Sequence, residues 1–175
     1  MQHTGRLIDD NVHALMQGIE LIPAIDDEAY STTTAPFAKS AVGGHFRHCI
    51  DFYTCFLSGL ETGRINYDLR ERNTAVETNR LAAIEKIEAI IERLRSLAPE
   101  DGEHEVQVIS ECSENNPAPD WSRSSVRREL QFLLSHTIHH YAIVALSLRM
   151  RGIEPGEEFG VAPSTLRHWR AQCAR

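Results

Sequence analysis

The sequence contains no long apolar run and no excess of positive charge. No segment approaches the roughly 18 consecutive apolar residues that a transmembrane helix needs, and the first residues, MQHTGRLIDDN, carry no apolar signal region. The formal net charge is −7 over 175 residues, which argues against a general binder of nucleic acids or of anionic membranes. We therefore expect a cytoplasmic protein with neither a nucleic-acid nor a membrane partner.

The cysteines form no recognisable motif, and the short signatures of several enzyme classes are absent. The four cysteines form no CxxC pair and no dense framework, which is typical of a reducing compartment (Cys49, Cys55, Cys112 and Cys173). The sequence has no GxSxG elbow, no P-loop and no dinucleotide-binding fingerprint. Any catalytic chemistry must therefore come from another set of side chains.

The composition and the apolar periodicity predict one helical domain over residues 1–175. Hydrophobic residues make up 42% and charged residues 25%, as in ordinary globular proteins. Apolar residues recur every three or four positions in four long segments, and a shorter helix follows Pro163 (segments 6–21, 40–61, 74–97 and 125–151). Residues 104–110 alternate and predict a short strand. We expect an all-α four-helix bundle with a short C-terminal helix and at most a minor β hairpin.

Three histidines interrupt the apolar helix over residues 125–151. His136 and His140 are four residues apart, so their rings project about 40° apart around the helix and about 6 Å apart along it. This is the spacing of two metal ligands on one helix, whereas His139 shares their position less easily. The simpler interpretation is that they are hydrogen-bonded core histidines, but three in five positions is more than a core normally holds.

The segment over residues 40–61 offers a third ligand. His45, His48 and Asp51 lie along the flank of its apolar face. A helical wheel places His45 nearer the centre of that face and His48 nearer its edge, so periodicity slightly favours His45 as the ligand. The choice between the two histidines stays open at this point.

A charged segment, RINYDLRERN, follows this helix. It is interpreted either as a solvated loop or as a rim of guanidinium groups that binds a carboxylate or a phosphate. Under the second interpretation Arg64, Asp68 and Arg70 bind the substrate, and Arg72 adds to the rim.

Three stretches of the sequence resemble the DinB/YfiT-like superfamily of metal-binding four-helix bundles. They are GGHFRHCIDFY, GRINYDLRER and RELQFLLSHTIHHYAIVAL. The resemblance implies an up-down-down-up bundle, often dimeric, so a homodimer is expected. It also implies a divalent metal held by three histidines, and carried over to this sequence these are His48, His136 and His140. His45 and His139 then become candidates for orienting a ligand or transferring a proton.

The resemblance also indicates the kind of chemistry. The superfamily includes transferases and isomerases that use small thiols such as mycothiol or bacillithiol. Three neutral histidines leave a bound metal its full charge and an open position for water or a thiolate. The helix lacks the glutamate of an HExxH motif, because Thr137 and Ile138 follow His136. Asp51, Asp68, His45 or His139 would have to serve as the base, and His139, His45 and Asp51 are the catalytic candidates.

We thus expect a metal-dependent transferase or hydrolase that activates a small thiol or water. Three imidazoles suit Zn, Ni, Co or Fe(II), and affinity order alone does not choose among them; Zn or Ni is the expected ion. One alternative is a metal-binding or stress-related protein without catalysis. A second is a DNA-binding regulator, since residues 159–170 resemble the recognition helix of a helix-turn-helix.

Overall fold

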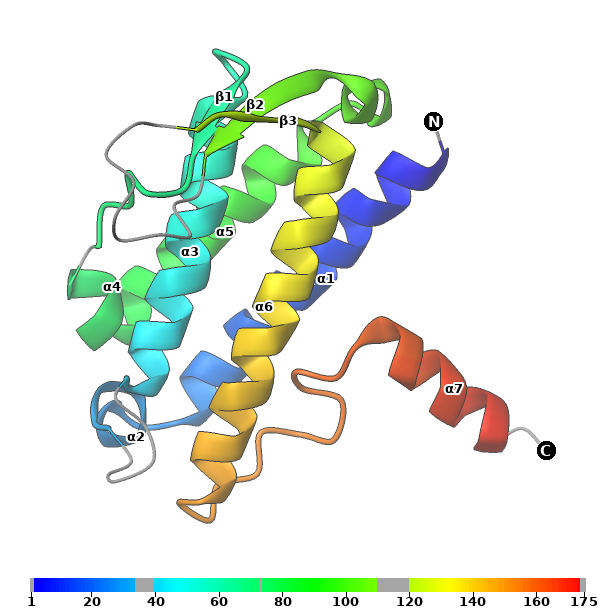
Figure 1. Cartoon of the computed structure of the whole chain (residues 1–175). Coiled ribbons are helices and arrows are strands. Elements are labelled where there is room, and N and C mark those ends of the chain that lie inside the picture. Colours follow the sequence, from blue (N-terminus) through cyan, green and yellow to red (C-terminus); the bar gives the residue numbers. More distant parts are fainter. Residues whose placement is uncertain (1, 34–39, 73, 110–119, 174–175) are drawn as a thin grey trace.

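Four long helices dominate the computed structural model, which describes residues 2–33, 40–72, 74–109 and 120–173 (Figure 1). They are α1 (Gln2–Ala24), α3 (Val42–Gly59), α5 (Arg80–Arg95) and α6 (Val126–Arg149). Helices α1 and α3 each pack against both α5 and α6. In Figure 1, α1 and α6 run in one direction and α3 and α5 in the other. The predicted up-down-down-up four-helix bundle is confirmed.

The core lies where the apolar faces of these helices meet. On α6 the buried apolar side chains recur at helical spacing (Leu130, Leu133, Tyr141, Val144 and Leu148). On α3 the buried face includes Phe46, Tyr53 and Phe56. Each such side chain contributes about 1.5–3 kcal/mol to the free energy of unfolding when it leaves water. The packing of these side chains between the helices fixes the distance between α3 and α6. No helix in the described part of the chain has the length and apolarity to cross a membrane.

The predicted helix over residues 74–97 is divided into α4 (Thr74–Thr78) and α5. Asn79 separates them with an extended backbone, and its side-chain oxygen accepts hydrogen bonds from the backbone N–H groups of Leu81 and Ala82. An asparagine in this role starts a new helix rather than continuing the old one. A further short helix, α2 (Asp27–Ser31), lies in the connection between α1 and α3.

A three-stranded sheet covers one end of the bundle (Figure 1). The strand predicted over residues 104–110 is present as β2 (Glu105–Ile109), after a 3-10 turn, η1 (Pro99–Glu103). It pairs in parallel with β1 (Arg64–Asn66) and antiparallel with β3 (Ser122–Ser125). The sheet therefore exceeds the expected hairpin by one strand. Three residues are too few for alternation to reveal β1.

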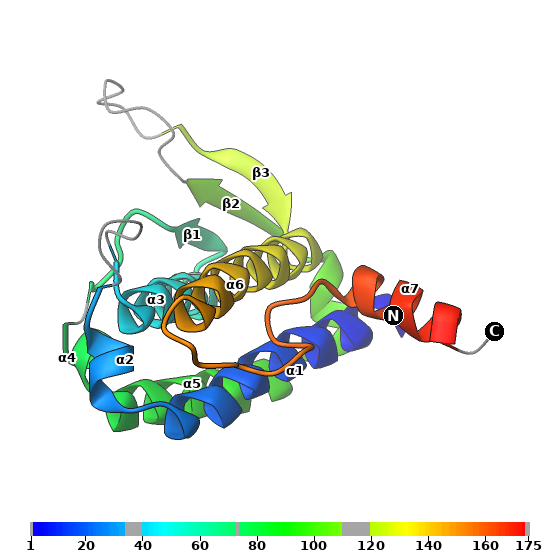
Figure 2. The ribbon, with the colours of Figure 1, turned by 90° about the horizontal axis from the view of Figure 1, so that it is seen from below.

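The last helix in the described part of the chain is α7 (Pro163–Cys173), which lies outside the four-helix bundle (Figures 1 and 2). The preceding segment packs on α6, where the Phe159 ring stacks on Tyr141 with centroids 4.8 Å apart. Residues 150–162 are all described and contain no helix. The segment directly before α7 therefore lacks the first helix that a helix-turn-helix requires.

Candidate metal centre

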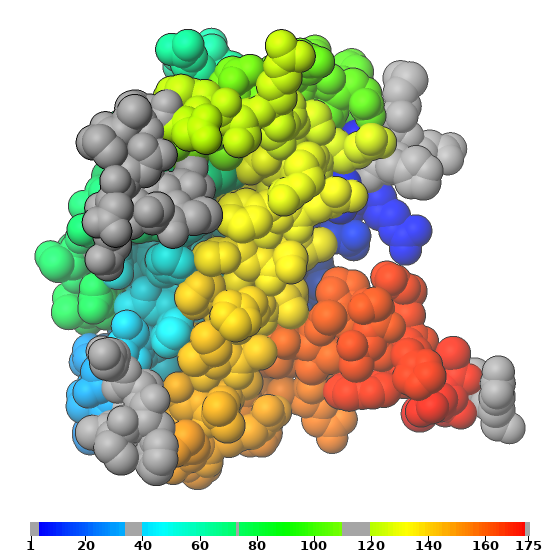
Figure 3. All heavy atoms as spheres, viewed as in Figure 1, coloured from blue at the N-terminus to red at the C-terminus, as the bar shows by residue number. Residues whose placement is uncertain are grey.

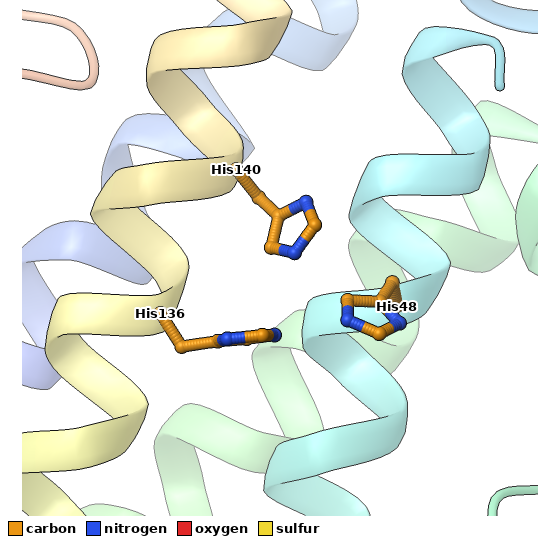
Figure 4. A group of neighbouring side chains, drawn as sticks. All are labelled: His48, His136 and His140. Atoms are coloured by element: carbon orange, nitrogen blue, oxygen red, sulfur yellow. The ribbon is translucent and has the colours of Figure 1, made fainter. Parts of the chain in front are cut away.

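Three histidines from two facing helices converge at one point (Figure 4). His48 lies on α3, and His136 and His140 lie one turn apart on α6. One nitrogen from each ring lies within 4.8 Å of the other two. The ring centroids are 5.0 Å apart for His48 and His136, 4.5 Å for His48 and His140, and 4.6 Å for His136 and His140. On the face shown in Figure 3, α3 and α6 lie side by side.

The His136 ring supplies the clearest sign of a missing partner. Its Nε2 atom is buried and has no hydrogen-bond partner among the described residues. The ring packs between Phe52 and Phe132, with centroids 4.5 Å and 5.4 Å away, neither of which can satisfy it. A buried polar atom left without a partner costs about 1–3 kcal/mol. A cation bound between the three imidazoles would remove that cost, so the residues present fit a metal ion.

Burial keeps these histidines uncharged at neutral pH. The pKa of His48 is lowered to about 4, first by burial and then by the neighbouring basic side chains, of which His136 and Arg70 have the largest effects. Burial, followed by the neighbouring histidines, lowers the pKa of His140 to about 3. The pKa of His136 is also lowered, by burial and then by His139 and Arg70. Neutral imidazole is the form that binds metal, so the cluster is in its binding state without any deprotonation step.

The structure places His45 beside the cluster and His139 at its outer edge. The Nδ1 atom of His45 lies 2.9 Å from the Nδ1 atom of His140, which is a hydrogen-bond distance. His139 is exposed, and its ring centroid lies 5.3 Å from that of His140. Of the two candidates for an auxiliary role, His45 therefore has the direct contact with a predicted ligand.

Asp51 belongs to a different cluster. It is buried on α3, and a carboxylate oxygen lies 3.1 Å from the Nη1 atom of Arg47. The Nε atom of the same arginine lies 2.9 Å from a carboxylate oxygen of Glu77 on α4. Burial raises the pKa of Asp51, while Arg47 and the backbone N–H of Arg72 oppose that rise. This geometry favours a role in joining α3 to α4 and to the loop before α4, which contains Arg72. The predicted catalytic role is not supported by any contact of Asp51 with the three histidines.

The predicted substrate-binding residues are separated by the fold. The Arg70 guanidinium lies 5.1 Å above the Phe52 ring, which itself contacts His48 and His136. The Arg64 guanidinium instead lies 5.3 Å from the Trp121 ring, at the sheet. Asp68 follows β1 in a turn, where its backbone N–H donates to the side-chain oxygen of Asn66. Of Arg64 and Arg70, only Arg70 therefore reaches the aromatic wall that Phe52 and Phe132 form beside the cluster.

A sequence model of the DinB superfamily matches residues 11–144, which include all three histidines. The chain belongs to the DinB superfamily. The match spans the bundle from α1 to α6, the part of the chain that builds the histidine cluster. The resemblance found in the sequence is thereby confirmed.

Two further comparisons concern a solved structure of a DinB-like protein and a longer protein. The crystal structure of the DinB-like protein YjoA of Bacillus subtilis superposes with a TM-score of 0.61 and 16% identity, covering 88% of this chain and 94% of YjoA. At that identity the likeness shows the fold alone. FK506-binding protein 5 of Rhizopus delemar is 32% identical over 108 residues, which are 62% of this chain. The match spans only 28% of that longer protein.

The aromatic wall of this DinB site was not predicted from the sequence. Phe52 and Phe132 both pack on the His136 ring, yet neither was among the candidate site residues. A signal was available, however. Phe52 follows His48 by four residues and Phe132 precedes His136 by four, and residues four apart lie on the same face of a helix.

Proposed function

We propose that this DinB protein binds one divalent metal ion through His48, His136 and His140 and uses it to activate a small thiol or water. The buried, unpartnered Nε2 atom of His136 carries the metal-binding part of the proposal. Zn or Ni is the expected ion, and Co and Fe(II) are compatible with the same three nitrogen donors.

The character of the donors supports catalysis over a purely structural metal. The cluster contains no cysteine and no carboxylate in the described part of the chain. Structural zinc sites are usually closed by four protein ligands, whereas catalytic sites have three and leave one position for water or substrate. When bound, the ion would supply a full double positive charge, which acidifies a water molecule or binds a thiolate.

The surrounding residues suit a small anionic substrate. Arg70 is half-buried and lies over Phe52, so its charge is directed to the edge of the cluster. An arginine held over an aromatic ring presents its N–H groups to carboxylates and thiolates. His139 is the cluster's exposed neighbour, and we assign it the exchange of a proton between substrate and solvent.

A thiol titration tests this function. We would load tag-free protein with Co(II) and add thioglycolate, an anionic thiol, or 2-mercaptoethanol, a neutral one. The proposal predicts a thiolate-to-cobalt charge-transfer band in the near ultraviolet with wild type and none with His48→Ala. Arg70→Ala should weaken binding of thioglycolate more than that of 2-mercaptoethanol, and the matched control Arg64→Ala should leave both unchanged.

The opposite outcome favours the non-catalytic alternative. If the cobalt spectrum of wild type is the same with and without saturating thiol, and a pH titration reveals no ionising water, the metal has no exchangeable ligand. The protein would then be a metal-binding protein without turnover.

A further inference from the structure

The contact between His45 and His140 joins two nitrogen atoms of the same kind. Their Nδ1 atoms are 2.9 Å apart, and the ring centroids are 5.2 Å apart. A neutral imidazole carries hydrogen on one nitrogen only, so one ring must donate and the other accept. The contact therefore links the tautomer of His140 to that of His45.

The two possible arrangements differ at the opposite side of the His140 ring. If His140 donates from Nδ1, its Nε2 atom has a free lone pair. If His140 accepts at Nδ1, its Nε2 atom carries the hydrogen and cannot bind a cation. Figure 4 shows one nitrogen of the His140 ring directed toward His48 and His136 and the other directed away from them. With Nδ1 engaged by His45, Nε2 is the nitrogen left for the cluster.

We propose that His45 is a positioning residue that accepts the Nδ1 hydrogen of His140 and so holds the Nε2 lone pair of His140 on the metal. This inference rests on the proposed metal-binding function. It assigns His45 a role distinct from that of a ligand, and it gives a reason for two histidines on α3.

The helical geometry makes these two roles compatible. His45 and His48 are three residues apart, which places them on one side of α3 and about 4.5 Å apart along its axis. Helix α6 runs antiparallel to α3, so His140 lies beside His45 at one end of the cluster. Both rings are half-buried, which limits competition from water for the hydrogen bond. Orienting partners of metal-bound histidines typically raise metal affinity about 10–100-fold.

The test measures zinc affinity by competition with a chromophoric chelator. We expect His45→Ala to bind zinc about 10–100-fold more weakly than wild type, because the His140 ring loses its acceptor. His45→Gln retains a carbonyl oxygen that can accept the same hydrogen, so it should recover most of that loss. His168→Ala removes an exposed imidazole on α7, outside the bundle, and should leave the affinity unchanged. Thermal unfolding of the metal-free variants establishes that each one is folded.

A second readout follows the hydrogen itself. In the zinc-loaded protein, long-range proton–nitrogen NMR should show His140 with its hydrogen on Nδ1 and slow exchange of that hydrogen with solvent. His45→Ala should make the exchange fast, which a general packing defect would not do selectively.

Three results overturn the inference. If His45→Ala binds zinc as tightly as wild type, His45 has no positioning role. If both His45→Ala and His45→Gln abolish binding as completely as His48→Ala, His45 is itself a ligand. If wild type binds no zinc at all, the proposed function fails and the inference fails with it, and this result is distinguishable from the other two.

Discussion

At the scale of single residues, the electrostatics of the histidines determine how the protein responds to acid. The pKa values of His48 and His140 fall from 6.5 to about 4 and about 3, with burial as the largest cause. A charged imidazole at this position would be poorly solvated and would repel its neighbours. Metal binding should therefore withstand mild acid better than it would with histidines of ordinary pKa.

The same shifts predict how the stability of the metal-free protein depends on pH. Between pH 6.5 and about 4 the unfolded chain binds protons that the folded His48 does not bind. The free energy of unfolding is therefore retained above pH 6.5 and falls as the pH is lowered toward 4. Urea denaturation of metal-free wild type and His48→Gln across this range measures the effect. The variant should lose less stability on acidification, and an equal loss in both proteins would contradict the assignment.

The choice of His48 over His45 as the third ligand could not be made from helical periodicity. The four-residue spacing identified His136 and His140 as a pair, since one helix determines their relative position. The helical wheel slightly favoured His45 on α3, because the centre of an apolar stripe marks the direction of the core. The cluster instead lies where α3 and α6 meet at the edge of that core, and the structure brings His48 there. Family resemblance, and not periodicity, selected His48.

At the scale of elements, a buried polar network joins α1, α3 and α6. The Tyr53 hydroxyl on α3 donates to the side-chain oxygen of Asn11 on α1 at 2.7 Å and lies 3.4 Å from the hydroxyl of Thr137 on α6. The Asn11 amide in turn donates to the backbone carbonyl of Leu130 at 3.0 Å. Because Thr137 follows His136 directly, this network helps to fix the rotation of α6 that directs the histidines toward α3.

Two buried tyrosines give a matched test of the network. Tyr53→Phe should lower the free energy of unfolding by about 1–3 kcal/mol, because Asn11 loses a buried donor. Tyr141 is as deeply buried, but its hydroxyl has no hydrogen-bond partner among the described residues. Tyr141→Phe should therefore leave the stability unchanged or raise it. Chemical denaturation compares the two variants, and equal destabilisation would show that the network contributes nothing specific.

Element boundaries were predictable where periodicity determines them and not elsewhere. The apolar stripes gave the four long helices and the final helix, since each stripe reports a buried face. They did not reveal the break at Asn79, because the pattern continues across it while the asparagine side chain caps the next helix. They also missed β1, whose pairing partner lies more than 40 residues away in the sequence (Arg64 opposite Gln107).

At the scale of the whole molecule, a bound metal would connect two helices that are far apart in sequence. His48 and His136 lie on α3 and α6, on either side of the crossover that contains α4, α5 and the sheet. An ion that binds only the folded arrangement stabilises it by mass action. The stability of the protein should therefore depend on the concentration of free metal.

Thermal unfolding measures this dependence. At a free zinc concentration about 100 times the Kd, the folded state should gain about 2.7 kcal/mol. For a domain of this size that corresponds to a rise in Tm of roughly 5–10 °C, which removal of zinc by a chelator should reverse. His48→Ala should show no rise at the same zinc concentration. An equal rise in that variant would place the stabilising ion elsewhere.

The metal content of the purified protein tests the central claim most directly. We would measure it by elemental mass spectrometry on tag-free protein prepared without a nickel column, for wild type, His48→Ala, His136→Ala, His140→Ala and the control His168→Ala. We predict about one divalent ion per chain in wild type and the control, and loss of the ion in the three ligand variants. A wild-type protein that holds no metal after reconstitution would contradict the claim and leave the three histidines as structural residues.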